Sequence, residues 1–157
     1  MKQLVITSNS YEETQLIGKR LAGCLKPGVK VLMSGTLGAG KTALTRGICS
    51  CFGLEDYVTS PTFSLMNIYE GKQGVTVVHT DAYRLDAVDD LYDIGFYDCG
   101  DTAISIVEWA DNVFDSVPDE AGFVGIHIDK AADNEEKRVI TLKIPHDEEK
   151  NFEDFVF

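Results

Sequence analysis

The sequence of 157 residues has no hydrophobic run near the roughly 20 residues that a helix needs to span a bilayer. Its first apolar run, residues 4–6, is too short for the core of a signal peptide and is followed by polar residues. We therefore expect a cytoplasmic protein without a membrane segment.

Basic residues are scarce, because 14 Lys and Arg stand against 26 Asp and Glu and give a formal net charge of −12. The average field of such a protein repels a nucleic-acid backbone. If the protein works in a nucleic-acid pathway, we expect a partner to make most of the nucleic-acid contact.

Cysteine motifs are also lacking. The four cysteines include no C-x-x-C pair, and no histidine is spaced to complete a zinc site. We interpret them as reduced thiols that act as small apolar residues.

The pattern of apolar residues predicts one α/β domain over residues 1–157. Strands are expected near 4–6, 29–33, 63–69, 75–79, 103–107, 123–128 and 138–144. Helices are expected after the capping box of Ser10 and Glu13, over about 41–52, and over 86–92 with Asp86 as its cap. We predict a mixed β-sheet flanked by helices on both faces. Residues from about 146 to 157 form an acidic C-terminal tail, which is either a marginal helix or disordered and is able to dock by its aromatic residues.

A phosphate-binding loop of the form G-x-x-x-x-G-K-[ST] follows the apolar run at 29–33 and precedes a predicted helix. Its glycines permit positive φ and a close approach of backbone N–H groups to phosphate oxygens. The lysine adds a positive charge at the β and γ phosphates, and the final hydroxyl is a Mg²⁺ ligand. The positive end of the helix is directed at the same anion. The predicted nucleotide-binding residues are Gly35, Thr36, Leu37, Gly38, Ala39, Gly40, Lys41 and Thr42.

Two carboxylates follow apolar runs where a metal-linked acid is needed for hydrolysis or transfer. Asp81 follows residues 77–80 and Glu108 follows residues 104–107. Ligands of open α/β sheets bind outside the carboxyl ends of the strands, so both acids are candidates to face the phosphates. A surface charge or a helix cap is the alternative at each position. Thr62, in the Ser60-Pro61-Thr62 turn, lies either in a loop that closes over a γ-phosphate or in a plain proline turn.

Four stretches together resemble the TsaE (YjeE) family of small bacterial P-loop ATPases. They are the loop at 35–42, Ser60-Pro61-Thr62-Phe63, His79-Thr80-Asp81-Ala82-Tyr83-Arg84-Leu85 and Val107-Glu108-Trp109-Ala110-Asp111. The resemblance covers the chain up to the end of the last predicted strand and implies a P-loop NTPase-like fold.

The resemblance implies an ATPase of tRNA modification. Members of this family act in forming N6-threonylcarbamoyladenosine at position 37 of tRNA. They bind a TsaD–TsaB heterodimer and hydrolyse ATP with Mg²⁺, with low activity alone and stimulation by these partners, so that tRNA is contacted only indirectly.

Site roles also follow from the resemblance. Lys41 and Thr42 hold phosphates and Mg²⁺, and Asp81 is the metal-linked acid. Glu108 is the carboxylate that orients the attacking water, and it is included with Thr42 and Asp81 among the expected metal ligands. Thr62 is a switch-type residue near the γ-phosphate.

Several assignments stay open at this point. Trp109 is a candidate for stacking on the nucleotide base or on a partner, and packing in the core or an interface is the alternative. His79 is expected to be hydrogen-bonded to its neighbours, and Arg46 is expected on an exposed helix face. A small-molecule P-loop kinase and a non-hydrolytic nucleotide-sensing module are the alternative functions, and ATP or ADP is the expected ligand in each case.

Overall fold

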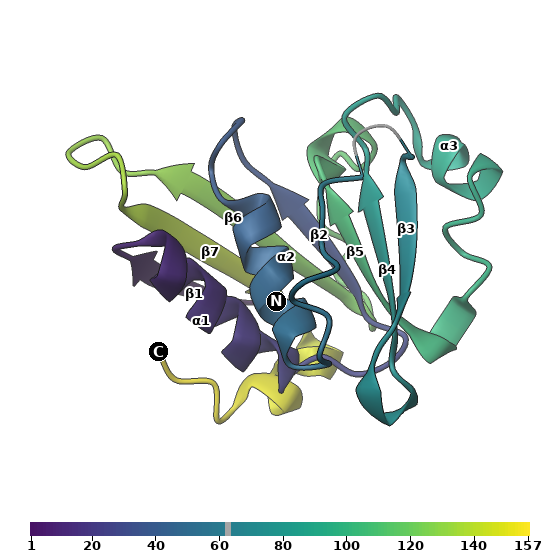
Figure 1. The fold of residues 1–157 in the computed structure, drawn as a ribbon, viewed down its shortest axis with the longest axis horizontal. Coiled ribbons are helices and arrows are strands. Elements are labelled where there is room, and N and C mark those ends of the chain that lie inside the picture. The colour runs from purple at the N-terminus through teal and green to yellow at the C-terminus, as the bar shows by residue number, and fades with distance from the viewer. Residues whose placement is uncertain (62–63) are drawn as a thin grey trace.

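A mixed seven-stranded sheet forms the centre of the computed structural model, which describes residues 1–61 and 64–157 (Figure 1). The strand order is β1-β7-β6-β2-β5-β4-β3. The four central strands, β6, β2, β5 and β4, run parallel, and antiparallel pairs complete both edges. The strands are β1 (Lys2–Ser8), β2 (Lys30–Ser34), β3 (Met66–Glu70), β4 (Thr76–Asp81), β5 (Ala103–Glu108), β6 (Phe123–Lys130) and β7 (Arg138–Ile144).

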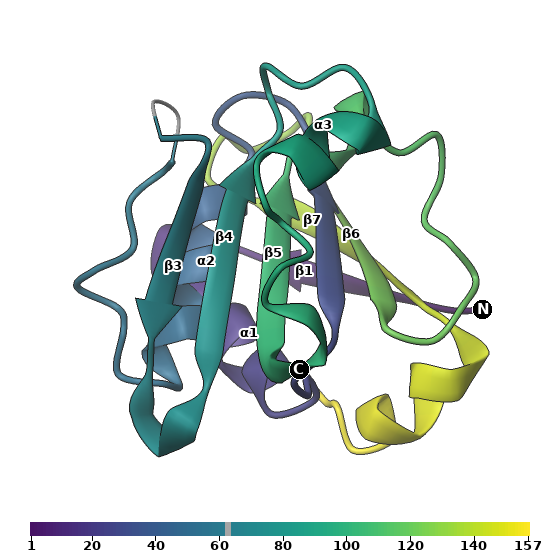
Figure 2. The ribbon, with the colours of Figure 1, turned by 90° about the vertical axis from the view of Figure 1, so that its right-hand side faces the viewer.

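Helices cover both faces of the sheet, as predicted. Helices α1 (Tyr11–Ala22) and α2 (Lys41–Ser50) lie on one face, and α3 (Val88–Asp93) lies on the other, as the two views show (Figures 1 and 2). Short 3₁₀ segments flank β5, with η2 (Gly100–Thr102) before it and η3 (Ala110–Asn112) after it. A further 3₁₀ segment, η1 (Lys72–Gly74), joins β3 to β4. Each face has its own apolar core, one with α1 and α2 and one with α3. None of the helices in the described ranges is long and apolar enough to cross a membrane.

The alternation of strand side chains places the two predicted acids on the α2 face. Ile104 and Ile106 of β5 belong to the core under α1 and α2, and Glu108 is the next residue of that face. Val77 of β4 belongs to the same core, so His79 and Asp81 follow it on this face. The period of two along each strand therefore directs both carboxylates towards the helix that begins at the phosphate-binding loop.

Helices α1 and α2 pack unusually close, because a glycine stands on each at the contact. A Cβ atom added to Gly18 would lie 2.3 Å from the carbonyl oxygen of Leu44, and one added to Gly47 would lie 2.1 Å from that of Gln15. Both obstacles are backbone atoms, which cannot turn aside as a side chain does. The position of α2 over the sheet, and with it the start of α2 at the loop, depends on this contact.

Replacing Gly47 with alanine is therefore expected to destabilise the fold, although Gly→Ala in an exposed helix usually stabilises by up to about 1 kcal/mol. Overpacking of this kind costs about 1–3 kcal/mol, so thermal unfolding should begin several degrees lower. Gly23→Ala is the matched control, since its Cβ would meet nothing closer than the carbonyl oxygen of Arg20 at 3.4 Å. An unchanged or higher melting midpoint for Gly47→Ala would contradict the close contact.

One local prediction needs correction, and an open alternative is decided. Asp86 does not cap α3: the carboxylate of Asp90 accepts hydrogen bonds from the backbone N–H groups of Asp86 and Ala87, at 2.8 and 3.0 Å, because it lies one turn into the helix and reaches back. Of the two alternatives for the tail, a marginal helix or disorder, the structure shows the helical one, since residues His146–Phe152 form a 3₁₀ helix, η4. Phe152 is only 1% exposed within the core beneath α1, so burial of an aromatic ring holds the tail in place.

Candidate nucleotide-binding site

The loop between β2 and α2 adopts a conformation that requires glycine. Gly35 has φ of 136°, and a Cβ there would lie 2.3 Å from the carbonyl oxygen of Ile128. Gly40 has φ of 111° and is the N-cap of α2. Leu37, 81% exposed, lies between them and lines the cavity described below. The backbone therefore takes the tight path that a phosphate-binding loop needs before a helix N-terminus.

Lys41 is folded back onto this loop. Its Nζ atom donates hydrogen bonds to the carbonyl oxygens of Gly35 and Thr36, at 2.5 and 3.0 Å. The same atom lies 3.9 Å from the centroid of the Trp109 ring, a cation–π contact. Trp109 also meets Tyr83 edge-on, with ring centroids 5.0 Å apart. Gly35 and Thr36 thus hold the lysine through their carbonyl groups, and Trp109 covers it.

Three acidic side chains act electrostatically on the Lys41 ammonium group. Burial lowers the pKa of Lys41 below its ordinary value, and the negative charges of Glu108, Asp111 and Asp81 oppose that shift. The side chain is only 5% exposed. A buried lysine whose hydrogen bonds go to neutral carbonyl oxygens is well suited to bind phosphate, because phosphate oxygens form stronger, charge-assisted hydrogen bonds with the ammonium group.

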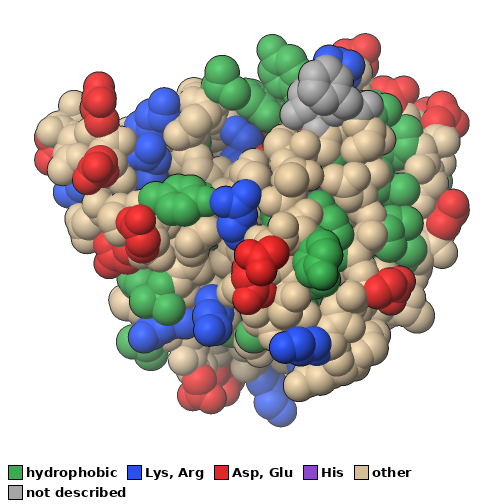
Figure 3. All heavy atoms as spheres, viewed as in Figure 1, with side chains coloured by type: hydrophobic (Ala, Val, Ile, Leu, Met, Phe, Trp, Pro, Cys, Tyr) green, Lys and Arg blue, Asp and Glu red, His purple; other side chains and the backbone are tan. Residues whose placement is uncertain are grey.

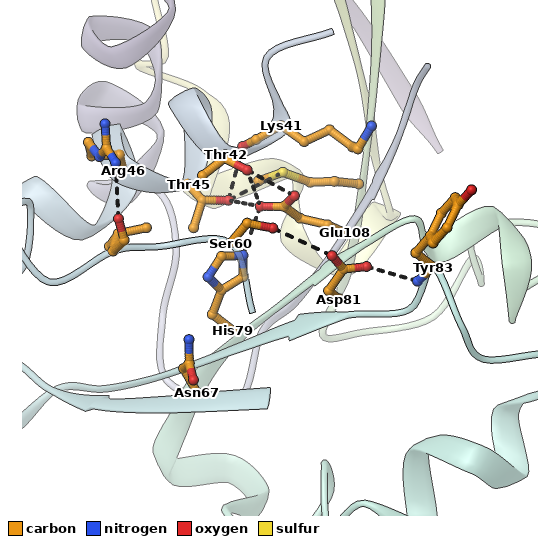
Figure 4. Close-up of polar contacts among 12 residues, drawn as sticks. Lys41, Thr42, Thr45, Arg46, Ser60, Asn67, His79, Asp81, Tyr83 and Glu108 are labelled. Carbon is orange, nitrogen blue, oxygen red and sulfur yellow. Dashed lines mark hydrogen bonds and ion pairs between the residues drawn. The ribbon is translucent and has the colours of Figure 1, made fainter. Parts of the chain in front are cut away.

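Glu108 connects the central strand β5 to the first turns of α2. Thr42 Oγ1 lies 3.3 and 3.2 Å from its two carboxylate oxygens, and Thr45 Oγ1 lies 3.3 Å from Oε1. His79 Nε2 lies 2.7 Å from the same Oε1 atom (Figure 4). Glu108 is 3% exposed, so it is a buried carboxylate held by three side chains next to the predicted Mg²⁺ ligand Thr42.

Asp81 stands beside Glu108 at the carboxyl end of β4, since the two residues are partners in the parallel register of β4 and β5. It is 4% exposed. Its Oδ1 atom accepts a hydrogen bond from the backbone N–H of Tyr83 at 2.9 Å, and Oδ2 lies 3.5 Å from Ser60 Oγ (Figure 4). The prediction that both strand-end acids approach the loop agrees with this placement. The surface-charge alternative does not, because neither carboxylate is exposed.

A cavity of about 800 Å³ opens over these groups, within the range of small-molecule sites. One end holds the loop and the acids, and the other is formed by the start of α1 and the β6–β7 connection. Among the described residues its lining includes Ser10, Tyr11, Glu12, Thr14, Leu37, Gly38, Ala39, Gly40, Lys41, Thr42, Ala43, Ser60, Asp81, Tyr83, Glu108, Trp109, Glu135, Glu136 and Arg138.

Arg138 is a residue of this region that sequence reasoning missed. Its Nε atom donates to the carbonyl oxygen of Ala39 at 2.8 Å, and Nη2 lies 3.4 Å from that of Gly38. It stands 99 residues away in the chain, at the start of β7, and no motif surrounds it. Arg46 also differs from expectation, because it is only partly exposed and donates to Tyr11 Oη at 2.7 Å and to the Val58 carbonyl at 3.0 Å. Thr62 lies outside the described residues.

The donor atoms suit Mg²⁺. Within residues 1–61 and 64–157 no three His, Cys, Asp or Glu side chains gather into a group that could hold a metal ion by themselves. Mg²⁺ characteristically needs less than that, since it takes one or two carboxylates together with substrate phosphates and water. The Thr42 hydroxyl and the carboxylates of Glu108 and Asp81 are hard oxygen donors on one side of the cavity.

Comparison with known proteins agrees with these motifs. The family model described as "Threonylcarbamoyl adenosine biosynthesis protein TsaE" matches residues 8–140, most of the chain. The chain belongs to the TsaE family. A TsaE relative from Treponema pallidum, named as a tRNA threonylcarbamoyladenosine biosynthesis protein, is 32% identical over 122 residues, which cover 77% of this chain and 89% of the relative. A TsaE relative from Rickettsia conorii is 40% identical over 106 residues, which cover 67% of this chain and 60% of the relative.

The fold is also that of a TsaE relative of known structure. The crystal structure of YdiB from Bacillus subtilis superposes with a TM-score of 0.73 at 31% identity, and covers 98% of this chain and 93% of that one. The P-loop NTPase-like fold expected from the motifs is confirmed. The TsaE match runs from β1 into β7 and ends before η4.

Proposed function

We propose that this chain binds ATP with Mg²⁺ and hydrolyses it, and that it does so as a subunit needed for N6-threonylcarbamoyladenosine formation at position 37 of tRNA. The observation that carries the hydrolytic part is the meeting of Lys41, Thr42 and Glu108 at one end of the cavity. Membership of the TsaE family supports the pathway. The partner is the TsaD–TsaB heterodimer, which would stimulate a low activity of the chain alone.

Each residue at that end has a role in the proposal. Lys41 binds the β and γ phosphates, for which it leaves the carbonyl oxygens that hold it here. Thr42 and Asp81 hold Mg²⁺, which supplies charge neutralisation on the phosphates when bound. Glu108 accepts a hydrogen bond from the attacking water and orients it towards the γ-phosphate, and its carboxylate is a further metal ligand. Trp109 covers the lysine and limits the entry of bulk water to the part of the cavity where the phosphates would bind.

The surface charge supports an indirect role towards tRNA. On the face shown in Figure 3, Lys and Arg side chains lie between Asp and Glu side chains and do not form a continuous stripe. With a net charge of −12, the protein has little electrostatic attraction to a tRNA backbone. The proposal therefore gives tRNA contact to the partner proteins and ATP turnover to this chain.

Reconstitution tests the proposal. The purified chain, TsaD–TsaB, tRNA, threonylcarbamoyl adenylate and MgATP are combined, and modified tRNA and free phosphate are measured over several turnovers. We expect modification to continue beyond a single turnover only when this chain is present, with phosphate release accelerated by the heterodimer. The Lys41→Ala variant should behave as if the chain were omitted. Modification that proceeds equally without the chain, or transfer of phosphate to an added metabolite with no free phosphate, would overturn the proposal.

A further inference from the structure

We propose that His79 is a positioning residue that holds the carboxylate of Glu108 in its working orientation. The proposal rests on the ATPase activity proposed above. His79 lies on β4, the second strand from the β3 edge, between β3 and β5, and it is 0% exposed. It stands two residues before Asp81 on the same face of β4, one step deeper than the acids at the strand ends.

The contact between the two side chains is direct. His79 Nε2 lies 2.7 Å from Glu108 Oε1, with both side chains buried (Figure 4). An ionised carboxylate can only accept hydrogen bonds, so the ring must carry its proton on Nε2 and donate. The other ring nitrogen, Nδ1, has no hydrogen-bond partner among the described residues. The Glu108 contact is therefore the one polar interaction found for this ring within that part of the chain.

The contact acts on the reaction only through Glu108. The ring is fully buried, and His79 is not among the described residues that line the cavity. A nucleotide in the cavity would therefore not reach the His79 ring. Glu108 Oε1 is contacted by His79 from strand β4 and by Thr45 from helix α2. Its Oε2 atom lies beside Thr42, which lines the cavity.

This arrangement restricts the rotation of a flexible side chain. A glutamate at a strand end has several rotamers, and the one observed places both carboxylate oxygens of Glu108 beside Thr42 Oγ1. The His79 bond fixes that rotamer before the substrate arrives, which lowers the cost of ordering the site during the reaction. Removing an outer partner of this kind typically costs about 10- to 100-fold in activity.

Two substitutions at one position separate orientation from packing. His79→Leu keeps much of the volume but removes the donor, whereas His79→Gln keeps an N–H donor at about the place of Nε2. We expect His79→Leu to lower kcat for ATP hydrolysis about 10- to 100-fold, with the Kd for MgADP within about 2-fold of the unchanged protein. His79→Gln should recover most of the loss.

Thr80→Val is the matched control on the same strand. Thr80 is also 0% exposed, but its side chain points to the opposite face, and its hydroxyl has no hydrogen-bond partner among the described residues. This variant should keep kcat, because it disturbs β4 to a similar extent without touching Glu108. A kcat for His79→Leu equal to that of Thr80→Val would overturn the positioning role, as would equal losses for His79→Leu and His79→Gln.

A second readout does not use turnover. The ring N–H of His79 should give a slowly exchanging, downfield proton signal in NMR spectra of the ¹⁵N-labelled chain, and Glu108→Gln should move it upfield. A signal that does not respond to Glu108→Gln would show that the pair does not form. Absence of ATP hydrolysis by the unchanged chain, with and without its partners, would instead overturn the proposed function, so the two failures are distinguishable.

Discussion

Replacing Glu108 with glutamine is expected to stop ATP hydrolysis while nucleotide binding persists. The amide has nearly the same shape and still reaches Thr42, but it lacks the negative charge that orients and polarises a water molecule. General-base groups of this kind contribute about 10²- to 10⁴-fold, so kcat should fall by at least about 100-fold. Phosphate release in single-turnover and steady-state assays measures the change, and isothermal titration with MgADP checks that binding remains.

A charge-matched control separates this effect from general electrostatics. Asp115 is exposed, follows η3 and is not among the described residues that line the cavity. Asp115→Asn removes one negative charge from the same segment and should leave kcat within about 2-fold. If Glu108→Gln lost hydrolysis but still supported tRNA modification over many turnovers, the chain would be a nucleotide-sensing module instead of an ATPase.

Replacing Lys41 with alanine is expected to abolish stabilisation by MgATP. A ligand at about 100 times its Kd adds roughly 2.7 kcal/mol to the free energy of unfolding, which raises the melting midpoint of a domain of this size by several degrees. Without the Lys41 ammonium the loop loses the buried cation that the proposal places at the β and γ phosphates, and the shift should disappear. Because Lys41 contacts Trp109, the single tryptophan, nucleotide should also change the fluorescence of the unchanged protein and not that of the variant.

Two controls accompany this test. Lys41→Met keeps the long aliphatic chain without its charge and should behave like Lys41→Ala, which assigns the effect to the ammonium group. Lys19→Ala removes an exposed lysine from α1 and should keep the full thermal shift. An equal rise in melting midpoint for Lys41→Ala and the unchanged chain would contradict phosphate binding by this loop.

Local chemistry made the phosphate-binding loop predictable. Its glycines, lysine and threonine are consecutive, and the strand before and the helix after are visible as an apolar run and a helical period. The capping box at Ser10 is likewise local, and its Oγ atom accepts the Glu13 backbone N–H at 3.1 Å. The β6–β7 hairpin follows from alternation across a polar connection. Each of these features depends on residues that lie close together in the sequence.

The sequence positions of the two strand-end acids were predictable, but the fact that they lie side by side was not. An apolar run that ends in a carboxylate can be read from the sequence, which singled out Asp81 and Glu108. Their proximity depends on β4 and β5 being neighbours in the sheet, with Asp81 opposite Glu108. Strand order is decided by how complete layers pack, and residues 66 positions apart, such as Thr42 and Glu108, meet only as a result.

The sequence by itself determined the loop, the fold class and, through its motifs, the family. Only the tertiary structure decided that His79 Nε2 lies against the carboxylate of Glu108, that Arg138 reaches the loop from β7, and that Phe152 anchors the tail in the core. The physical reason is the range of the interactions involved. Backbone conformation and helix capping are set by adjacent residues, whereas buried hydrogen bonds and core contacts depend on which surfaces the packed sheet brings together.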